Sequence, residues 1–104
     1  MLLQFLECLT ILKLPTMNDL YTISPTQIVM YTTDYCSDCS RARAFFDANG
    51  IPYLRVNLEG NFEATDFVMK INDGYQSVPT IVFPDGSILV EPQWEELKAK
   101  ISNS

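Results

Sequence analysis

The sequence contains no histidine and only three cysteines among its 104 residues. Without histidine, the chain cannot use histidine for acid–base catalysis or as a metal ligand. Three cysteines are too few, and odd in number, for the paired disulfide framework of a small secreted domain. We therefore expect a protein of a reducing compartment, the cytoplasm.

Basic residues are also scarce. Seven lysines and arginines stand against thirteen acidic residues, and the formal net charge is −6. No run of basic residues supplies the face that nucleic acid requires, so a nucleic-acid partner is not expected. Apolar residues make up 47% of the chain, which is enough for a compact core in one domain of this length.

A membrane-spanning segment is not expected either. The most apolar stretch, residues 1–15, is too short and is interrupted by Glu7 and Lys13. It has neither the basic start nor the small-residue cleavage site of a secretory signal. Its apolar positions follow helical spacing: Leu2, Phe5, Leu6, Leu9 and Leu12. The stretch is either a short amphipathic helix, docked or interfacial, or a dispensable extension before a start at Met17.

The remaining chain alternates strand-like and helix-like patterns. Strands are expected at residues 27–31, 53–58, 80–83 and 88–90, and helices at 36–49, 64–71 and 92–101. A helical crossover makes the first two strands parallel, and the Asp-Gly turn makes the last two an antiparallel hairpin. The order βαβαββα predicts an α/β fold in which helices cover both faces of a mixed four-stranded sheet. Residues 1–26 are assigned to an amino-terminal extension and connector, and residues 27–104 to the domain.

The last helix is expected to begin at Pro92, because the fixed φ of proline suits the first helical position. Trp94, Leu97 and Ile101 follow at helical spacing. They are expected to form the buried face of this helix.

Two cysteines, Cys36 and Cys39, are spaced C-x-x-C between the first strand and the first helix. At this place in a βαβ unit the spacing indicates a redox-active dithiol. Cys36 would face the unpaired N–H groups and the positive dipole end of the helix, which favour the thiolate that attacks disulfides. Cys39, one turn further and more buried, could then attack the mixed disulfide. We predict Cys36 as the nucleophile and Cys39 as the resolving thiol.

Charged neighbours leave the pKa of the Cys36 thiol open. Asp34 and Asp38 flank it and would raise the pKa. Arg41 and Arg43, just inside the helix, could offset this effect. Asp34 could equally be the cap of the helix.

The same spacing occurs in metal sites. Zinc usually needs four ligands, and this chain offers only Cys8 beyond the pair, so no metal site within one chain is expected. An iron–sulfur cluster held between two subunits through Cys36 is the alternative function. Cys8 itself is expected to be a plain apolar helix residue.

From Gln27 to Ile101 the chain resembles glutaredoxin-type members of the thioredoxin-like family, in particular the mycoredoxin-like branch. The matching segments are Val29–Thr33, Cys36–Cys39, Ser77–Thr80 and Val82–Ser87. The resemblance implies a thioredoxin-like (glutaredoxin) fold. It also implies a thiol–disulfide oxidoreductase that acts on protein disulfides or on mixed disulfides with a low-molecular-weight thiol.

The resemblance further implies a groove beside the dithiol. The Val78–Pro79 bond would be cis and would face Cys36, and the Val78 backbone would pair with the backbone of a bound thiol cofactor or substrate. Tyr35 would form a wall of the same groove. Alternatively, Tyr35 is only an exposed aromatic residue of the loop.

The reductant stays open within this resemblance. Glutathione-using members carry a Gly-Gly-Cys-Asp-like turn, and this chain has Leu89–Gln93 at that place. Glutathione, mycothiol and a thioredoxin-reductase-like protein donor are all allowed, and no tightly bound cofactor is expected. We expect a monomer.

Overall fold

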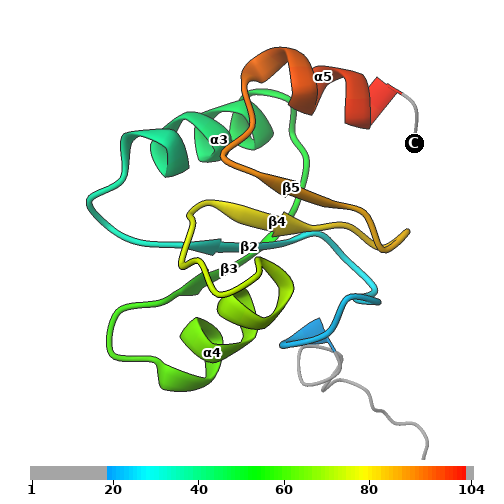
Figure 1. Ribbon diagram of the computed structural model, residues 1–104. Helices are drawn as coiled ribbons and strands as arrows, with labels where there is room; N and C mark the ends of the chain where they lie inside the picture. Colours follow the sequence, from blue (N-terminus) through cyan, green and yellow to red (C-terminus); the bar gives the residue numbers. More distant parts are fainter. Residues whose placement is uncertain (1–18, 103–104) are drawn as a thin grey trace, which may run out of the picture.

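The computed structural model describes residues 19–102 (Figure 1). In chain order the elements are β2 (Val29–Thr32), α3 (Ser37–Ala48), β3 (Leu54–Asn57), α4 (Phe62–Ile71), β4 (Thr80–Val82), β5 (Ile88–Val90) and α5 (Trp94–Ser102). The predicted order βαβαββα is confirmed, with element ends that differ slightly from the expected ones. The stretch 1–15, expected to be an amphipathic helix or a dispensable extension, and Cys8 within it lie outside the described residues.

The four strands form one mixed sheet in the order β3-β2-β4-β5. β2 runs parallel to β3, with Val29 opposite Leu54, and antiparallel to β4, with Tyr31 opposite Thr80. β4 and β5 form the antiparallel hairpin that the Asp-Gly turn predicts. Every residue of β2 is buried, as expected for a central strand covered on both faces.

Helices cover both faces of the sheet, as predicted: α4 lies on one face, and α3 and α5 lie on the other (Figure 1). Alternate residues of β2 serve the two cores. Val29 and Tyr31 pack with Ala64 and Val68 of α4, whereas Met30 packs with residues of α3 and α5 such as Phe46. Within the described residues, no helix is long and apolar enough to cross a membrane.

The start of α5 differs from the prediction. The helix begins at Trp94, and Pro92 is buried before it rather than at its first position. The Gln93 backbone N–H donates to the Glu96 carboxylate at 2.8 Å, and the Leu97 N–H donates to the Gln93 carbonyl at 3.1 Å. This cap three residues before Glu96 sets the helix start.

The expected buried face of α5 is only partly correct. Leu97 is fully buried and Ile101 is partly buried, but Trp94 is 43% exposed. Its indole packs edge-to-face on Phe45 of α3, with ring centroids 5.3 Å apart, and its N–H donates to the Arg41 carbonyl at 3.3 Å. Trp94 therefore joins α5 to the outer side of α3 rather than to the sheet.

Residues 19–26, expected as a connector, pack against the sheet. The Tyr21 N–H donates to the Tyr31 hydroxyl at 2.9 Å, and the Tyr21 ring lies 6.1 Å from that of Phe67. Asp19 is fully buried and accepts hydrogen bonds from the Thr26 backbone N–H and hydroxyl and from the Gln27 amide. This segment therefore crosses the α4 face before the chain enters β2.

Candidate active site

Cys36 lies just beyond the carboxyl end of β2 and is itself the N-cap of α3. Its backbone is extended, with φ −135° and ψ 112°. Its Sγ accepts a hydrogen bond from the Cys39 backbone N–H at 3.0 Å. The expected contact between this thiol and the unpaired N–H groups of the helix start is confirmed.

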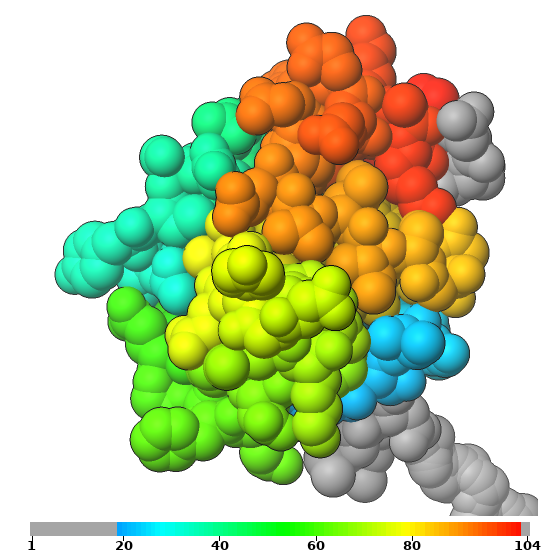
Figure 2. Space-filling view, in the orientation of Figure 1, coloured from blue at the N-terminus to red at the C-terminus, as the bar shows by residue number. Residues whose placement is uncertain are grey.

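The loop before β4 brings Val78 and Pro79 to the same place. Their peptide bond is cis, as predicted. The Cys36 thiol donates to the Val78 carbonyl, with Sγ 3.6 Å from the oxygen. Figure 2 shows the segment before β4, in yellow, next to the start of α3, in cyan and teal. Residues 42 positions apart in the chain thus form one site.

The two thiols differ in accessibility. Both are free, but Cys36 is partly exposed, whereas Cys39 is fully buried on α3. An external disulfide can therefore reach Cys36 and not Cys39. This difference is the one that a nucleophile and a resolving thiol require.

The pKa of the Cys36 thiol is raised above its ordinary value. Burial is the largest cause, and the neighbouring Cys39 thiol and the charge of Asp38 add to it. The hydrogen bond from the Cys39 backbone N–H acts in the opposite direction. In the reduced dithiol, the N–H at the helix start stabilises the Cys36 thiolate less than burial and the neighbouring groups destabilise it.

The arginines that could have offset this effect are engaged elsewhere. Arg41 forms an ion pair with Asp38, with an N–O distance of 2.8 Å. Arg43 donates to the hydroxyls of Thr32 and Ser40 at 3.0 and 3.1 Å. Arg41 is thus paired with Asp38 and Arg43 is bonded to the end of β2, and neither arginine is among the groups that set the pKa of Cys36.

Asp34 is not a helix cap, contrary to one of the two expectations for it. Its carboxylate accepts a hydrogen bond from the Asn57 side chain at 2.8 Å and lies 3.4 Å from the Arg55 guanidinium. The cap position is taken by Cys36, whose Sγ accepts the N–H that a cap would accept. Asp34 instead ties the loop after β2 to β3.

Two further residues border the site. Tyr35, next to Cys36, is 94% exposed, so its side chain is available to a bound molecule. Glu91, which the sequence analysis passed over, has a φ of 49°, and its backbone N–H donates to the Pro79 carbonyl at 2.9 Å. The predicted hairpin could have located Glu91, because the pairing of Thr80 with Val90 places the residue after β5 opposite Pro79.

A metal site would need several ligands close together. Within residues 19–102, no group of three or more His, Cys, Asp or Glu side chains could hold a metal ion.

Solved structures share the fold of this chain. A mutant of the thioredoxin-like protein BC3987 is similar with a TM-score of 0.65 at 23% identity, covering 74% of this chain and 96% of that one. The glutaredoxin from Archaeoglobus fulgidus is similar with a TM-score of 0.60 at 24% identity, covering 72% and 85%. These structures show that the chain has the thioredoxin-like fold, as predicted.

Sequence comparison then gives the family. The Glutaredoxin family model matches residues 28–88, more than half of the chain. A Mycobacterium tuberculosis protein that is named as a glutaredoxin is 42% identical over 74 residues, covering 71% of this chain and 88% of its own length. Mycoredoxin 1 of Corynebacterium glutamicum is 32% identical over 76 residues, covering 73% and 94%.

The chain belongs to the glutaredoxin family. It is a glutaredoxin-like thiol–disulfide oxidoreductase, and its family indicates low-molecular-weight thiols and disulfides as reaction partners.

Proposed function

We propose that this protein reduces mixed disulfides between proteins and a low-molecular-weight thiol, with Cys36 as the nucleophile and Cys39 as the resolving thiol. One observation carries the proposal. The partly exposed Cys36 Sγ accepts the Cys39 backbone N–H at 3.0 Å, while the Cys39 side chain is fully buried one turn further along α3. The accessible sulfur therefore also has the group that stabilises its anion.

The reaction transfers two electrons in two exchanges. The Cys36 thiolate attacks the sulfur of the small thiol in the mixed disulfide; a new S–S bond forms, and the protein thiolate leaves and takes up a proton. Cys39, after losing its proton, then attacks Cys36 Sγ. The small thiol leaves, and Cys36 and Cys39 are oxidised to a disulfide, which an external reductant must reopen.

The groove for the substrate is proposed on Tyr35, Val78 and Pro79. Val78 supports this assignment because its carbonyl already accepts the Cys36 thiol proton, so its backbone lies within reach of any group bonded to that sulfur. Tyr35 supports it because its ring is almost fully exposed beside Cys36. When a substrate binds, its backbone N–H would replace the Cys36 thiol as the donor to the Val78 carbonyl.

We propose a mycothiol-type thiol as the small partner. The support is the similarity to mycoredoxin 1, whose name refers to that chemistry, and the presence of Leu89–Gln93 where glutathione-using members carry a Gly-Gly-Cys-Asp-like turn. A thioredoxin-reductase-like donor could reopen the Cys36–Cys39 disulfide in place of the thiol. A reducing compartment such as the cytoplasm suits both routes.

The test is intact-mass analysis of a Cys39→Ser variant, with Cys8→Ser added so that Cys36 is the only thiol. The variant is mixed with mycothiol disulfide or glutathione disulfide near neutral pH. We expect one stable adduct, formed faster with mycothiol disulfide. A matched Cys36→Ser, Cys8→Ser protein should form none, because Cys39 is buried. An adduct on Cys39 alone would overturn the assigned roles, and faster reaction with glutathione disulfide would overturn the thiol assignment.

A further inference from the structure

A chain of hydrogen bonds links the end of α4 to the loop that carries Val78. The Asn72 side chain, at the C-cap of α4, donates to the Thr80 hydroxyl oxygen at 2.9 Å. The Thr80 hydroxyl in turn donates to the Ser77 carbonyl at 2.7 Å. A hydroxyl that accepts one hydrogen bond is polarised and donates the next one more strongly. Asn72, Thr80 and Ser77 therefore form one connected unit, the Thr80 network.

Thr80 is the fixed point of this network. It is fully buried as the first residue of β4, and it pairs with Tyr31 on one side and with Val90 on the other. The sheet therefore sets the position of its hydroxyl. A buried hydroxyl without partners costs free energy, so both of its hydrogen bonds are expected to persist.

The carbonyl groups on both sides of Val78 are held in place. The Ser77 carbonyl is held by the network, and the Pro79 carbonyl accepts the Glu91 N–H at 2.9 Å. Each peptide group is planar, so fixing the carbonyls before and after Val78 leaves its own carbonyl little freedom to turn. That carbonyl accepts the Cys36 thiol, with its oxygen 3.6 Å from Sγ. Its direction toward Cys36 is thus set from two sides.

We propose that Asn72 and Thr80 are positioning residues for the reduction of mixed disulfides, because they hold the Val78 backbone where a substrate on Cys36 can pair with it. This inference rests on the proposed function, which assigns Val78 to the substrate groove. Both residues act through Val78 and not on the sulfur. Their removal should therefore weaken substrate binding without weakening the nucleophile.

Two reactions of the same sulfur separate these effects, measured by intact mass in a Cys8→Ser, Cys39→Ser background. Reaction with a peptide–mycothiol mixed disulfide requires pairing with Val78, whereas alkylation by iodoacetamide requires only the thiolate. Thr80→Val removes the hydroxyl and keeps the shape of the side chain. We expect the rate constant with the mixed disulfide to fall about 3- to 10-fold, the equivalent of one hydrogen bond, while alkylation does not slow. Thr80→Ser keeps the hydroxyl and should retain the parent rate.

A second variant tests the other end of the network. Asn72→Ala removes only the first hydrogen bond, so the same rate should fall, but less. Asn49→Ala is the matched control, because Asn49 is the C-cap of α3 and its side chain donates to the Phe45 carbonyl at 2.8 Å. This cap lies at the end of α3 away from Cys36, so its removal should leave both rates unchanged.

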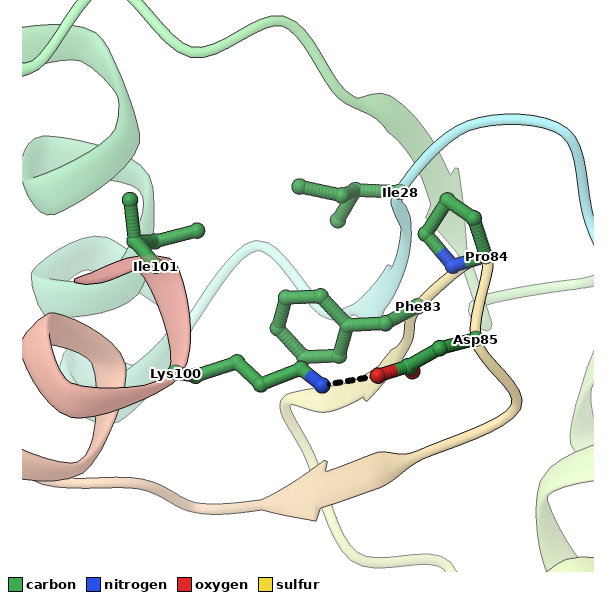
Figure 3. A pocket seen from close by; sticks show the side chains of 6 residues that line it. All are labelled: Ile28, Phe83, Pro84, Asp85, Lys100 and Ile101. Carbon is green, nitrogen blue, oxygen red and sulfur yellow. Dashed lines mark hydrogen bonds and ion pairs between the residues drawn. The ribbon is translucent and has the colours of Figure 1, made fainter. Parts of the chain in front are cut away.

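A control for loss of stability lies at the amino end of β2, at the opposite end of the sheet from Cys36. A pocket of about 380 Å³ is lined there by Ile28, Phe83, Pro84, Asp85, Lys100 and Ile101. In Figure 3 the Phe83 ring lies among the other apolar side chains, and the ion pair between Lys100 and Asp85 lies along one side. Ile101→Ala should enlarge this pocket and lower the free energy of unfolding, yet change neither rate.

Urea denaturation checks that each variant is folded, and Asn72→Ala decides the question if Thr80→Val is not. Three results would overturn the positioning role: an unchanged rate with the mixed disulfide in Thr80→Val, equal slowing of both reactions, or a Thr80→Ser protein as slow as Thr80→Val. Slower reaction in Ile101→Ala would also overturn it, because loss of stability alone would then explain the effect. A parent protein that does not react with the mixed disulfide would overturn the proposed function itself, and the positioning role with it.

Discussion

The two ends of strand β2 have opposite characters. At the carboxyl end, Cys36 and Val78 form a partly exposed site that is linked by a 3.6 Å hydrogen bond. At the amino end, the buried Asp19 carboxylate accepts hydrogen bonds from Thr26 and Gln27 beside an apolar pocket. At one end a sulfur atom is accessible to other molecules, and at the other end hydrogen bonds within the chain hold residues 19–27 in place.

The difference shows how a small domain separates chemistry from stability. Reactive groups must stay accessible, so they bury little apolar surface and add little to the free energy of unfolding. The opposite end can bury a carboxylate because three donors satisfy it: the Thr26 backbone N–H, the Thr26 hydroxyl and the Gln27 amide. Substitutions at the carboxyl end should therefore change reactivity, and substitutions at the amino end should change the free energy of unfolding.

The largest effect is expected for Cys36→Ser. Reduction of mixed disulfides should fall to the uncatalysed rate, because the attacking sulfur is lost. The free energy of unfolding should stay nearly unchanged, since serine is a good N-cap. A turnover assay and urea denaturation on the same preparation check both halves. Residual turnover close to that of the unsubstituted protein would contradict the assignment of Cys36.

The reciprocal change is Asp19→Ala. It leaves the Thr26 N–H and the Gln27 amide without their buried acceptor, so we expect a loss of about 2 to 3 kcal/mol in the free energy of unfolding. Turnover per folded molecule should not change. Urea denaturation at pH 7 measures the loss, and Asp66→Ala, which removes an exposed ion-pair carboxylate, should cost less than about 0.5 kcal/mol.

The difference in the free energy of unfolding between the parent protein and Asp19→Ala should depend on pH. Burial alone would raise the pKa of Asp19, but hydrogen bonds from Thr26 and Gln27 outweigh it and lower the pKa. A lowered pKa in the folded state means that the stabilisation is complete above the unfolded-state value of about 3.9 and is lost as pH falls further. The difference between the parent protein and Asp19→Ala should therefore shrink below pH 4. An equal difference at pH 3 and pH 7 would contradict a lowered pKa for Asp19.

A smaller effect is expected from Asp38→Asn at the carboxyl end. Burial, with a contribution from Asp38, raises the pKa of Cys36, so the rate of its alkylation should have a midpoint above the value of about 8.5 for an ordinary cysteine. Removing the Asp38 charge should lower that midpoint and speed alkylation at pH 7. Iodoacetamide kinetics on a Cys8→Ser protein measure both, and a midpoint below 8 in the parent would contradict the raised pKa.

The smallest effect is expected for Asp34→Ala. Asp34 makes exposed contacts with Asn57 and Arg55, and surface ion pairs contribute little. The free energy of unfolding should fall by less than about 0.5 kcal/mol. A loss of about 1 to 2 kcal/mol would be typical of a removed helix cap. It would contradict the assignment of Cys36, rather than Asp34, as the N-cap of α3.

Local patterns were sufficient for most of the fold. The C-x-x-C spacing before a helical pattern placed Cys36 at the start of α3, and the Asp-Gly turn predicted the hairpin of β4 and β5. These features depend on neighbours within a few residues. The errors at Pro92 and Trp94 arose because a helix start and an exposed fraction depend on contacts that local periodicity does not contain.

The amino-acid sequence by itself determined the order of strands and helices, the family, and the pairing of Cys36 with Cys39 on one helix turn, because these follow from spacing along the chain. Only the tertiary structure decided the environment of the thiol. The Cys36 thiol contacts the Val78 carbonyl, and the Glu91 N–H bonds to the Pro79 carbonyl; both contacts join segments that are far apart in the chain. Burial and hydrogen bonding then set the pKa of Cys36, and both are properties of the packed molecule.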